Sequence, residues 1–490
     1  MEDWFKDRGY PHFTHRTPLA VKAKILRYIN NPDKVAKHSF APFILKTLSQ
    51  RRYKLSTFGK IEKRSHKILS NGITKSNEKI REILYATHID AHIYSYYSQE
   101  ILSDKYEKYL ESNIHISTVV SAYRQIPTFC KTKFKNNMHF AKDVFDEIKI
   151  RQNCVALAFD IENFFPSLNH RLLKLIWSKM LNCKALPPDH YNIFKSVTNF
   201  SYVKLQDLKT KKRHFDEKEL SKLKKKGNIL FQNIAKLIDS PVVIHKNQKH
   251  RNGNLIGIPQ GLPISALLAN IYMLPFDEAI INGLTLKHNI FYRRYSDDIV
   301  ILCQEDQVDL VKNFIEKEIQ KIELTISIPK TEVTLFKNED GRLQSFKVID
   351  DDLIFNVPMT YLGFEFYGYQ TLLKSKNLAS FYREMKSTIR RKSKQIKKRN
   401  EKILNDEVIF YKRKVYRLYS FKGQKSRYLP AKKIELINNK FMVKRFKRKF
   451  RGNYIRYVYR AADEMHSPEL KRQVRNHWKI LTQSIIRFSK

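Results

Sequence analysis

The feature of this sequence that most limits its fold is the segment FYRRYSDDIV, residues 291–300, which places two adjacent aspartates between apolar runs. Residues 290–295 and 299–303 are predicted to be β-strands, separated by Ser296, Asp297 and Asp298. Adjacent carboxylates repel each other, so a half-buried hairpin is a costly place for them unless they bind something. Taken alone, the dipeptide is also compatible with a hydrophilic hairpin turn.

A third carboxylate follows an apolar strand in CVALAFDIENFF, where Asp160 precedes two phenylalanines. No Lys or Arg lies within six residues of Asp160, so a local ion pair does not account for it. Mg²⁺ prefers carboxylate oxygens, and two such ions about 3.5–4 Å apart can stabilise an in-line phosphoryl transfer. We therefore expect Asp160, Asp297 and Asp298 to converge on two Mg²⁺ ions, with Mn²⁺ as a substitute.

A glycine- and proline-punctuated loop leads into an apolar helix in GIPQGLPISALLANIYM, residues 257–273. Gly261 would let the backbone approach a ligand closely, and Gln260 offers both a donor and an acceptor. Ordinary turn chemistry at a helix start explains the same loop equally well without the two carboxylate motifs.

The charge of the chain points to a polyanionic partner. The 490 residues carry a formal net charge of +45, with 42% apolar residues for a packed core. A folded protein this basic is typical of nucleic-acid binding. No apolar run approaches the ~20 residues of a membrane-spanning helix, and the N-terminal residues lack a signal-peptide core. The four scattered cysteines indicate reduced, mostly buried thiols in a cytoplasmic protein.

Three regions differ in their pattern. Periodicity predicts a mainly helical region over residues 1–150. Strands then alternate with helices up to about residue 370, which predicts an α+β sheet, with an exposed lysine-rich insertion around 201–250. Residues 371–490 hold 36 Lys and Arg against 8 Asp and Glu, with apolar residues at helical spacing, and we predict a basic helical domain there.

The segments FDIENFF, IPQGLPIS and YSDD resemble, in order, motifs A, B and C of reverse transcriptases. ELTISIPKTEV is similar to motif D and TYLGFEFYG to motif E, so the resemblance covers roughly residues 120–370. It implies a right-hand polymerase fold. Residues 1–150 would hold the fingers, 151–370 an RRM-like palm, and 371–490 an all-helical basic thumb.

The resemblance also implies a role for each matching residue. Asp160 and Asp297 resemble the main metal ligands, joined by the Ile161 carbonyl, and Asp298 resembles a third, weaker carboxylate. On the nucleotide side, Phe165 would be a steric gate against ribose, and Gln260 and Gly261 would contact the incoming nucleotide. Arg124 would contact the triphosphate, and Lys330 would donate a proton to pyrophosphate. Leu362, Gly363 and Phe364 would form the primer grip. Each of three residues also has a plainer interpretation. Phe165 can be a core aromatic, Lys330 a surface lysine and Arg124 part of a structural salt bridge.

The N-terminal segment RGYPHF, the fingers segment AYR (residues 122–124) and the YSDD core resemble most those of the bacterial unknown-group and abortive-infection reverse transcriptases. Those enzymes are associated with antiphage defence. The chain lacks recognisable RNase H acids and the paired Cys and His of a zinc-bearing endonuclease region. The implied partners are dNTPs, a DNA product and an RNA template, expected to be a structured non-coding RNA, with the oligomeric state open. Template-independent or protein-primed DNA synthesis on the same palm is one alternative, and a non-catalytic RNA-binding scaffold is another.

Overall fold

The computed structural model describes most of the chain. The described residues are 4–51, 54–58, 61–65, 67–70, 73–76, 78–129, 133–209, 216–226, 229–231, 235–349, 352–400, 412–421, 428–437, 440–449 and 452–489. They divide into two compact units, which we describe separately. Unit 1 comprises Met1–Tyr123, Ile161–Asn282 and Ile315–Ile326, and unit 2 comprises Arg124–Asp160, Gly283–Phe314 and Ser327–Lys490.

Unit 2 is built on a six-stranded antiparallel sheet with strand order β12-β13-β7-β14-β15-β16. The strands are β7 (Cys154–Asp160), β12 (Phe291–Tyr295), β13 (Asp298–Cys303), β14 (Glu332–Glu339), β15 (Arg342–Ile349) and β16 (Asp352–Phe355). Every β13 residue after Asp298 is buried, as expected for a central strand. The predicted strands 290–295 and 299–303 are thus confirmed to within one residue.

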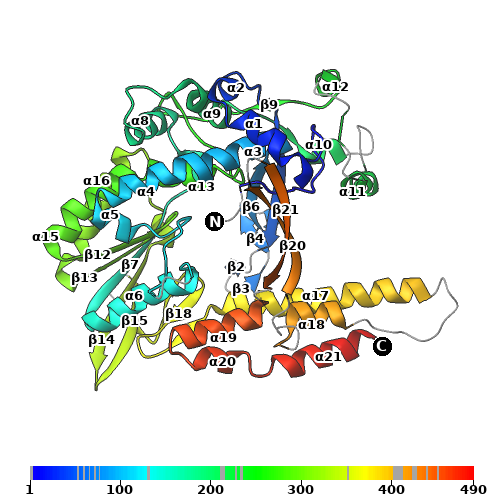
Figure 1. Cartoon of the computed structure of the whole chain (residues 1–490). Helices are drawn as coiled ribbons and strands as arrows, with labels where there is room; N and C mark the ends of the chain where they lie inside the picture. Colours follow the sequence, from blue (N-terminus) through cyan, green and yellow to red (C-terminus); the bar gives the residue numbers. More distant parts are fainter. Residues whose placement is uncertain are drawn as a thin grey trace. The chain divides into compact units, whose positions relative to one another are not determined.

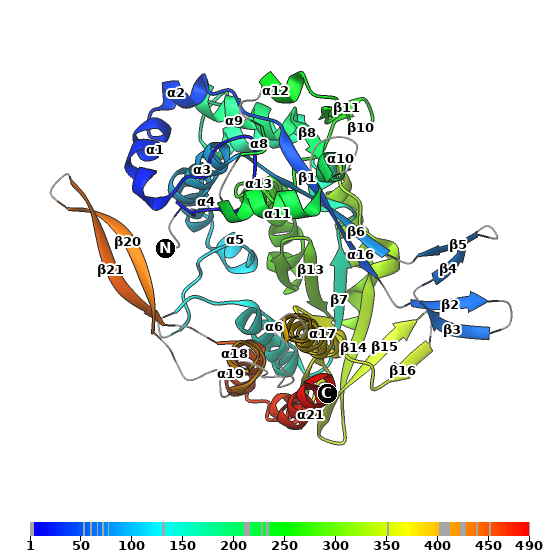
Figure 2. The ribbon, with the colours of Figure 1, turned by 90° about the vertical axis from the view of Figure 1, so that its right-hand side faces the viewer.

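Helix α6 (Asn137–Arg151) lies along one face of this sheet (Figures 1 and 2). Its buried side chains share a core with strands β7, β13 and β14 and with a small sheet, β17 (Met359–Tyr361), β18 (Phe364–Phe366) and β19 (Thr371–Leu373). Five C-terminal helices contribute to the same core: α17 (Ser375–Asn400), α18 (Arg413–Tyr419), α19 (Tyr454–Glu464), α20 (Glu469–Gln473) and α21 (His477–Ser489). This packing ties the basic C-terminal region to the sheet that carries the aspartates.

The C-terminal region is not all helical, which corrects the prediction. Strands β20 (Tyr428–Ile437) and β21 (Lys440–Lys449) form an antiparallel hairpin where the spacing predicted a helix. The sequence holds the physical reason: Pro430 is unfavourable inside a helix, and Asn438 and Asn439 are residue types that favour a short hairpin connection.

Unit 1 also contains strands where the sequence predicted mainly helix. Strand β1 (Phe43–Arg51) pairs with β6 (Glu78–Tyr85), β8 (Ser201–Lys204) joins β1 in parallel, and β9 (His245–Lys246) completes the sheet. Between β1 and β6 lie two hairpins, β2 (Lys54–Phe58) with β3 (Ile61–Ser65) and β4 (Lys67–Ser70) with β5 (Ile73–Ser76) (Figure 2). The partners of β1 are distant in sequence, and those of the two hairpins are neighbouring segments. Helical periodicity within one segment does not register either kind of pairing.

Helices surround the sheet of unit 1. They are α1 (Lys22–Ile29), α2 (Pro32–Ala36), α3 (His88–Tyr96), α4 (Ser103–Glu111), α5 (Ile114–Val119), α8 (His170–Met180), α9 (Pro188–Thr198), α13 (Ser265–Tyr272) and α14 (Leu274–Ile280). The predicted insertion forms α10 (Leu205–Lys209), α11 (Glu217–Lys226) and α12 (Ala235–Ile238), with residues 210–215 outside the described part. Leu208 and Leu237 are buried in a small core, so this insertion is partly packed.

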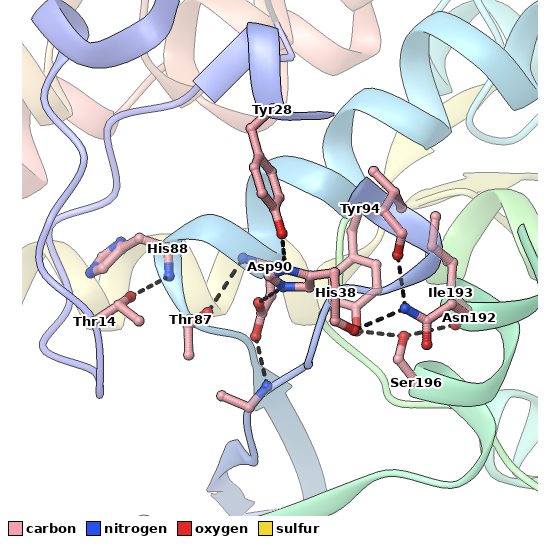
Figure 3. Close-up of polar contacts among 12 residues, drawn as sticks. Thr14, Tyr28, His38, Thr87, His88, Asp90, Tyr94, Asn192, Ile193 and Ser196 are labelled. Carbon is pink, nitrogen blue, oxygen red and sulfur yellow. Dashed lines mark hydrogen bonds and ion pairs between the residues drawn. The ribbon is translucent and has the colours of Figure 1, made fainter. Parts of the chain in front are cut away.

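A chain of polar contacts fixes the segment that leads into β1 (Figure 3). The Tyr28 hydroxyl contacts His38 Nδ1 at 2.9 Å, and His38 Nε2 lies 2.8 Å from Asp90 Oδ1. Asp90 Oδ2 also accepts a hydrogen bond from the Ala41 amide at 3.2 Å, and Asn192 donates to the His38 carbonyl at 2.9 Å. Helices α3 and α9 thereby hold the entry to the sheet from two sides.

Two further predictions concern cysteines and membranes. Cys154 and Cys303 are buried free thiols and Cys183 is an exposed one, whereas Cys130 lies outside the described residues. None of the helices in the described part of the chain combines the length and apolar character needed to cross a membrane.

Candidate active site

The sheet of unit 2 brings two of the predicted aspartates directly opposite each other. In the antiparallel pairing of β13 with β7, Asp298 is the partner of Asp160. Side chains at directly opposed positions lie on the same face of a sheet, with Cβ atoms about 5 Å apart. Residues 138 apart in sequence are thus neighbours because of strand register.

The third aspartate lies in the turn between β12 and β13. Tyr295 pairs with Asp298, so Ser296 and Asp297 form a two-residue connection, and Ser296 adopts a left-handed backbone with φ of 61°. A positive φ is typical of tight hairpin turns and costs free energy in a residue other than glycine. The fully buried Arg294 supports this conformation, because its Nη1 donates to the Ser296 carbonyl at 3.2 Å. The turn therefore presents Asp297 beside Asp298.

The charges of the other two aspartates act on Asp298. The pKa of Asp298 is raised to about 6, first because surrounding protein atoms reduce its hydration, and then because of the negative charges of Asp297 and Asp160. The surface of Asp298 is nevertheless open to solvent, so a ligand from solution can reach it. Lys374 and Lys330 oppose the rise in its pKa through their positive charges.

Asp160 already has a cationic partner in unit 2. Lys330 Nζ donates to Asp160 Oδ2 in a short ion pair. Lys330 ends a 3₁₀ turn, Ile328–Lys330, and this turn is tied to the strand because the Ser327 amide donates to the Asp160 carbonyl at 2.8 Å. The motif D lysine and the motif A aspartate therefore contact each other.

These residues have the chemistry of a hard-cation site. Among the described residues, no three His, Cys, Asp or Glu side chains stand in a ready-made metal cluster. The unneutralised repulsion at Asp298 is nevertheless what a divalent cation would relieve, and all the donors are carboxylate oxygens, which Mg²⁺ and Mn²⁺ prefer. The donor set fits such an ion once Asp160 is released from Lys330.

The predicted nucleotide-contacting residues of motifs A and B lie in unit 1, where they share one hydrogen-bonded arrangement. The Phe165 carbonyl accepts from the Ile258 amide at 2.9 Å, and the Gln260 carbonyl accepts from the Leu84 amide at 2.9 Å. Phe165 is half-buried, whereas Phe164 is buried and is the core aromatic of the pair.

Gly261 occupies a place that only glycine fits. Its φ is 115°, and a Cβ there would stand 2.8 Å from the Leu84 carbonyl oxygen and 2.8 Å from Ile83 Cγ2. The close backbone approach predicted at Gly261 is therefore to β6 of the same unit. Beside it lies a cavity of about 210 Å³, whose polar lining residues include Glu82, Tyr202, Lys246, Gln248, Lys249 and Gln260.

The chain passes from unit 2 to unit 1 between Asp160 and Ile161. Ile161 is buried. Arg124 is half-buried in the segment between α5 and α6. Whether Ile161 and Arg124 contact a metal and a triphosphate stays a prediction.

The predicted primer-grip residues form the turn between β17 and β18 in unit 2. Leu362 and Gly363 both have positive φ, at 44° and 95°, while Phe364 is fully buried in the core. Leu362 and Gly363 themselves are half-buried. The Gly363 carbonyl accepts from the Lys374 amide at 2.9 Å.

Two residues near the aspartates were missed in the sequence. Arg294 supports the Ser296 turn, and Lys374 acts electrostatically on Asp298. In a strand, Arg294 lies on the face opposite to Phe291 and Arg293, and this alternation was the signal for it. Buried arginines are rare, however, so alternation alone does not predict that Arg294 is the buried one. Lys374 lies 76 residues beyond Asp298, and no local pattern marks it.

Comparison with known proteins identifies a family for this chain. Residues 101–366 match the family described as reverse transcriptase (RNA-dependent DNA polymerase). Solved structures similar to the chain include apo telomerase from Candida tropicalis, truncated from the C-terminal domain, with 11% identity, a TM-score of 0.37 and coverage of 72% of this chain and 60% of that one. Telomerase from Candida albicans with a fragment of telomeric RNA is similar at 11% identity and a TM-score of 0.37, over 96% of this chain and 69% of that one. No curated protein sequence matches the chain.

Proposed function

Because the chain belongs to the reverse transcriptase (RNA-dependent DNA polymerase) family, we propose that it synthesises DNA on an RNA template, with Asp160, Asp297 and Asp298 as its catalytic carboxylates. The observation that carries this proposal is the direct pairing of Asp298 with Asp160 across β13 and β7, with Asp297 in the adjoining turn. The reaction is attack of a 3′-hydroxyl on the α-phosphate of a dNTP, with release of pyrophosphate.

We propose that Asp160, Asp297 and Asp298, together with the Ile161 carbonyl, hold two Mg²⁺ ions, for which Mn²⁺ can substitute. When bound, these ions supply charge neutralisation and alignment at the transferring phosphoryl group. Asp160 and Asp298 contribute negative charge at paired strand positions, and Asp297 contributes it from the adjoining turn.

On the nucleotide side, we propose the roles implied by the motifs. Phe165 would exclude a ribose 2′-hydroxyl, Gln260 and Gly261 would line the incoming nucleotide, and Arg124 would bond the triphosphate. Lys330 would protonate the leaving pyrophosphate. The half-burial of Phe165 supports the first of these roles.

In this proposal, the sheet of unit 2 is the palm, the N-terminal residues to about 150 provide the fingers, and the basic helices after residue 371 serve as a thumb. Leu362 and Gly363 would grip the primer, with Phe364 holding their turn in the core. The charge of residues 371–490, a net +28 out of the +45 of the chain, supports contact with a nucleic-acid backbone.

We further propose that the chain acts in the cytoplasm among the defence-associated bacterial reverse transcriptases, on a structured non-coding RNA. The support is the resemblance of its YSDD core, its fingers motif AYR and its N-terminal segment RGYPHF to that subgroup.

The test of the activity uses the full chain purified with the nucleic acid that accompanies it. Each labelled dNTP is supplied with Mg²⁺, and the products are treated separately with protease and RNase. Incorporation that needs all four dNTPs and the RNA supports templated synthesis. Incorporation of a single dNTP, indifferent to RNase, would instead indicate terminal transfer, and label released only by protease would add protein priming. No incorporation in Mg²⁺ or Mn²⁺ would favour an RNA-binding scaffold.

A further inference from the structure

The contact between Lys330 and Asp160 has a consequence for metal binding. Lys330 Nζ donates to Asp160 Oδ2, one of the oxygens that the proposed function assigns to a divalent ion. An ammonium and a divalent cation that approach the same carboxylate oxygen repel each other, so this ion pair weakens the attraction of Asp160 for the ion. Binding of the ion therefore competes with this ion pair.

Backbone hydrogen bonds fix the turn that carries Lys330, whereas the two side chains of the ion pair are partly open to solvent. The 3₁₀ turn that carries Lys330 is anchored by the Ser327 amide on the Asp160 carbonyl, and the Lys330 amide donates to the Ser327 carbonyl at 2.9 Å. The Lys330 side chain is 49% exposed and that of Asp160 is 25% exposed. The ammonium can thus swing into solvent without disturbing the strand, because a lysine side chain is long and flexible.

We infer that Lys330 is a built-in counter-cation that occupies Asp160 in the metal-free protein and is displaced when a divalent ion binds, an inference that rests on the proposed function of this site. In the metal-free state, the Lys330 ammonium offsets part of the repulsion among Asp160, Asp297 and Asp298. When the divalent ion binds the carboxylates, the Lys330 ammonium leaves Asp160. The positive charge of the ion thus replaces that of the lysine. Lys330 acts here as a regulator of metal affinity, separately from any proton transfer.

A neighbouring lysine provides a matched control. Lys374 also acts on Asp298 through its charge, and its effect there is at least as large as that of Lys330. The lysine that forms an ion pair with Asp160, however, is Lys330. If positive charge acted only through space, removal of either lysine would change metal affinity alike. If Lys330 competes directly for Asp160, removal of Lys330 has the larger effect.

The first experiment measures Mn²⁺ binding to the full chain by electron paramagnetic resonance of the free ion, at constant pH and without nucleotides. We expect Lys330→Met to tighten Mn²⁺ binding about two- to fivefold, the range of a partly exposed ion pair. Lys374→Met should change it by less than half as much, and Lys330→Arg, which keeps the charge, should not tighten it. Equal effects of the two methionine variants, or no tightening in Lys330→Met, would overturn the inference.

A second measurement needs no variant and guards against misfolding. The wild-type chain is treated with a limiting amine-acetylating reagent, with and without Mn²⁺, and modification of each lysine is followed by mass spectrometry. We expect Mn²⁺ to raise the modification rate of Lys330 at least about twofold and to leave that of Lys374 unchanged. An unchanged or lower rate at Lys330 would contradict displacement.

The proposed metal site and the displacement of Lys330 can be tested separately. If Asp297→Ala binds Mn²⁺ as well as the wild-type chain does, both the proposed metal site and this inference are wrong. If Asp297→Ala removes binding but Lys330→Met does not tighten it, the inference alone falls and the proposed function stands.

Discussion

At the scale of single residues, the candidate site stores unfavourable electrostatic free energy. Asp298 faces Asp160 across the sheet and adjoins Asp297, and its pKa rises to about 6 from an ordinary value of 3.8. The folded metal-free protein therefore holds a proton on Asp298 more tightly than the unfolded chain does. Such a cost is typical of sites arranged for a ligand.

This rise has a defined consequence for stability as a function of pH. Between about pH 4 and pH 6 the folded state binds more protons at Asp298 than the unfolded state, so stability falls as the pH rises through this window. Asp298→Asn removes the charge, and we expect it to stabilise the metal-free protein at pH 7.5 by on the order of 1 kcal/mol, after allowance for solvent screening. Urea unfolding in the presence of a chelator measures this gain, which should vanish near pH 4. A gain that persists at pH 4 would indicate another cause.

The two adjacent phenylalanines of motif A should respond differently to truncation. Phe164 is buried, so Phe164→Ala is expected to cost about 3 kcal/mol or more of unfolding free energy. Phe165 is half-buried, so Phe165→Ala should cost less than about half of that and instead weaken discrimination between dNTPs and rNTPs. Thermal unfolding and single-nucleotide incorporation measure the two effects. A stable Phe165→Ala protein with unchanged sugar discrimination would contradict the steric gate.

At the scale of elements, the motif B loop depends on its contact with β6. Gly261→Ala would place a Cβ against the Leu84 carbonyl oxygen and the Ile83 side chain, and the backbone atom cannot move aside. We expect a loss of about 2 kcal/mol or more in unfolding free energy, combining strain and overpacking.

Gly253 is the matched control for that variant within unit 1. Its φ is also positive, at 76°, but a Cβ there would meet nothing within 4 Å. Gly253→Ala should therefore cost only the conformational strain of about 1 kcal/mol. Equal losses in the two variants, measured by urea unfolding, would show that the approach of the loop to β6 is unimportant.

The elements that could be predicted from the sequence are those whose evidence is local. The strands on either side of Ser296 have their own pattern of apolar residues, and the structure confirms them. The strands between residues 43 and 85 and the hairpin of β20 and β21 depend on pairing, which single-segment periodicity does not contain. The same limit applies to the site: the aspartates could be predicted to converge, whereas the ion pair of Lys330 with Asp160 could not.

At the scale of the whole molecule, the net charge of +45 should dominate binding to nucleic acid. Lys386 and Lys394 are exposed on one face of α17, eight residues apart. Replacing both with Gln should weaken RNA binding uniformly across sequences and reduce the slope of log affinity against log salt by about 1.5.

The control for this double variant is replacement of Lys287 and Lys312 with Gln, two exposed lysines before the basic C-terminal region that change the net charge equally. Fluorescence anisotropy at several salt concentrations compares the pairs. If both pairs reduce the slope alike, the basic C-terminal region has no special part in binding and only total charge matters.

The central claim is that the paired aspartates catalyse DNA synthesis on RNA. The most direct measurement is extension of a DNA primer on a defined RNA template by the full chain, with four dNTPs and Mg²⁺, for wild type, Asp297→Ala and Asp306→Ala. Asp306 is an exposed acid of the same unit, outside the site. We predict template-length product from wild type and Asp306→Ala, and at least about a thousandfold less from Asp297→Ala. Extension that survives Asp297→Ala would contradict the account.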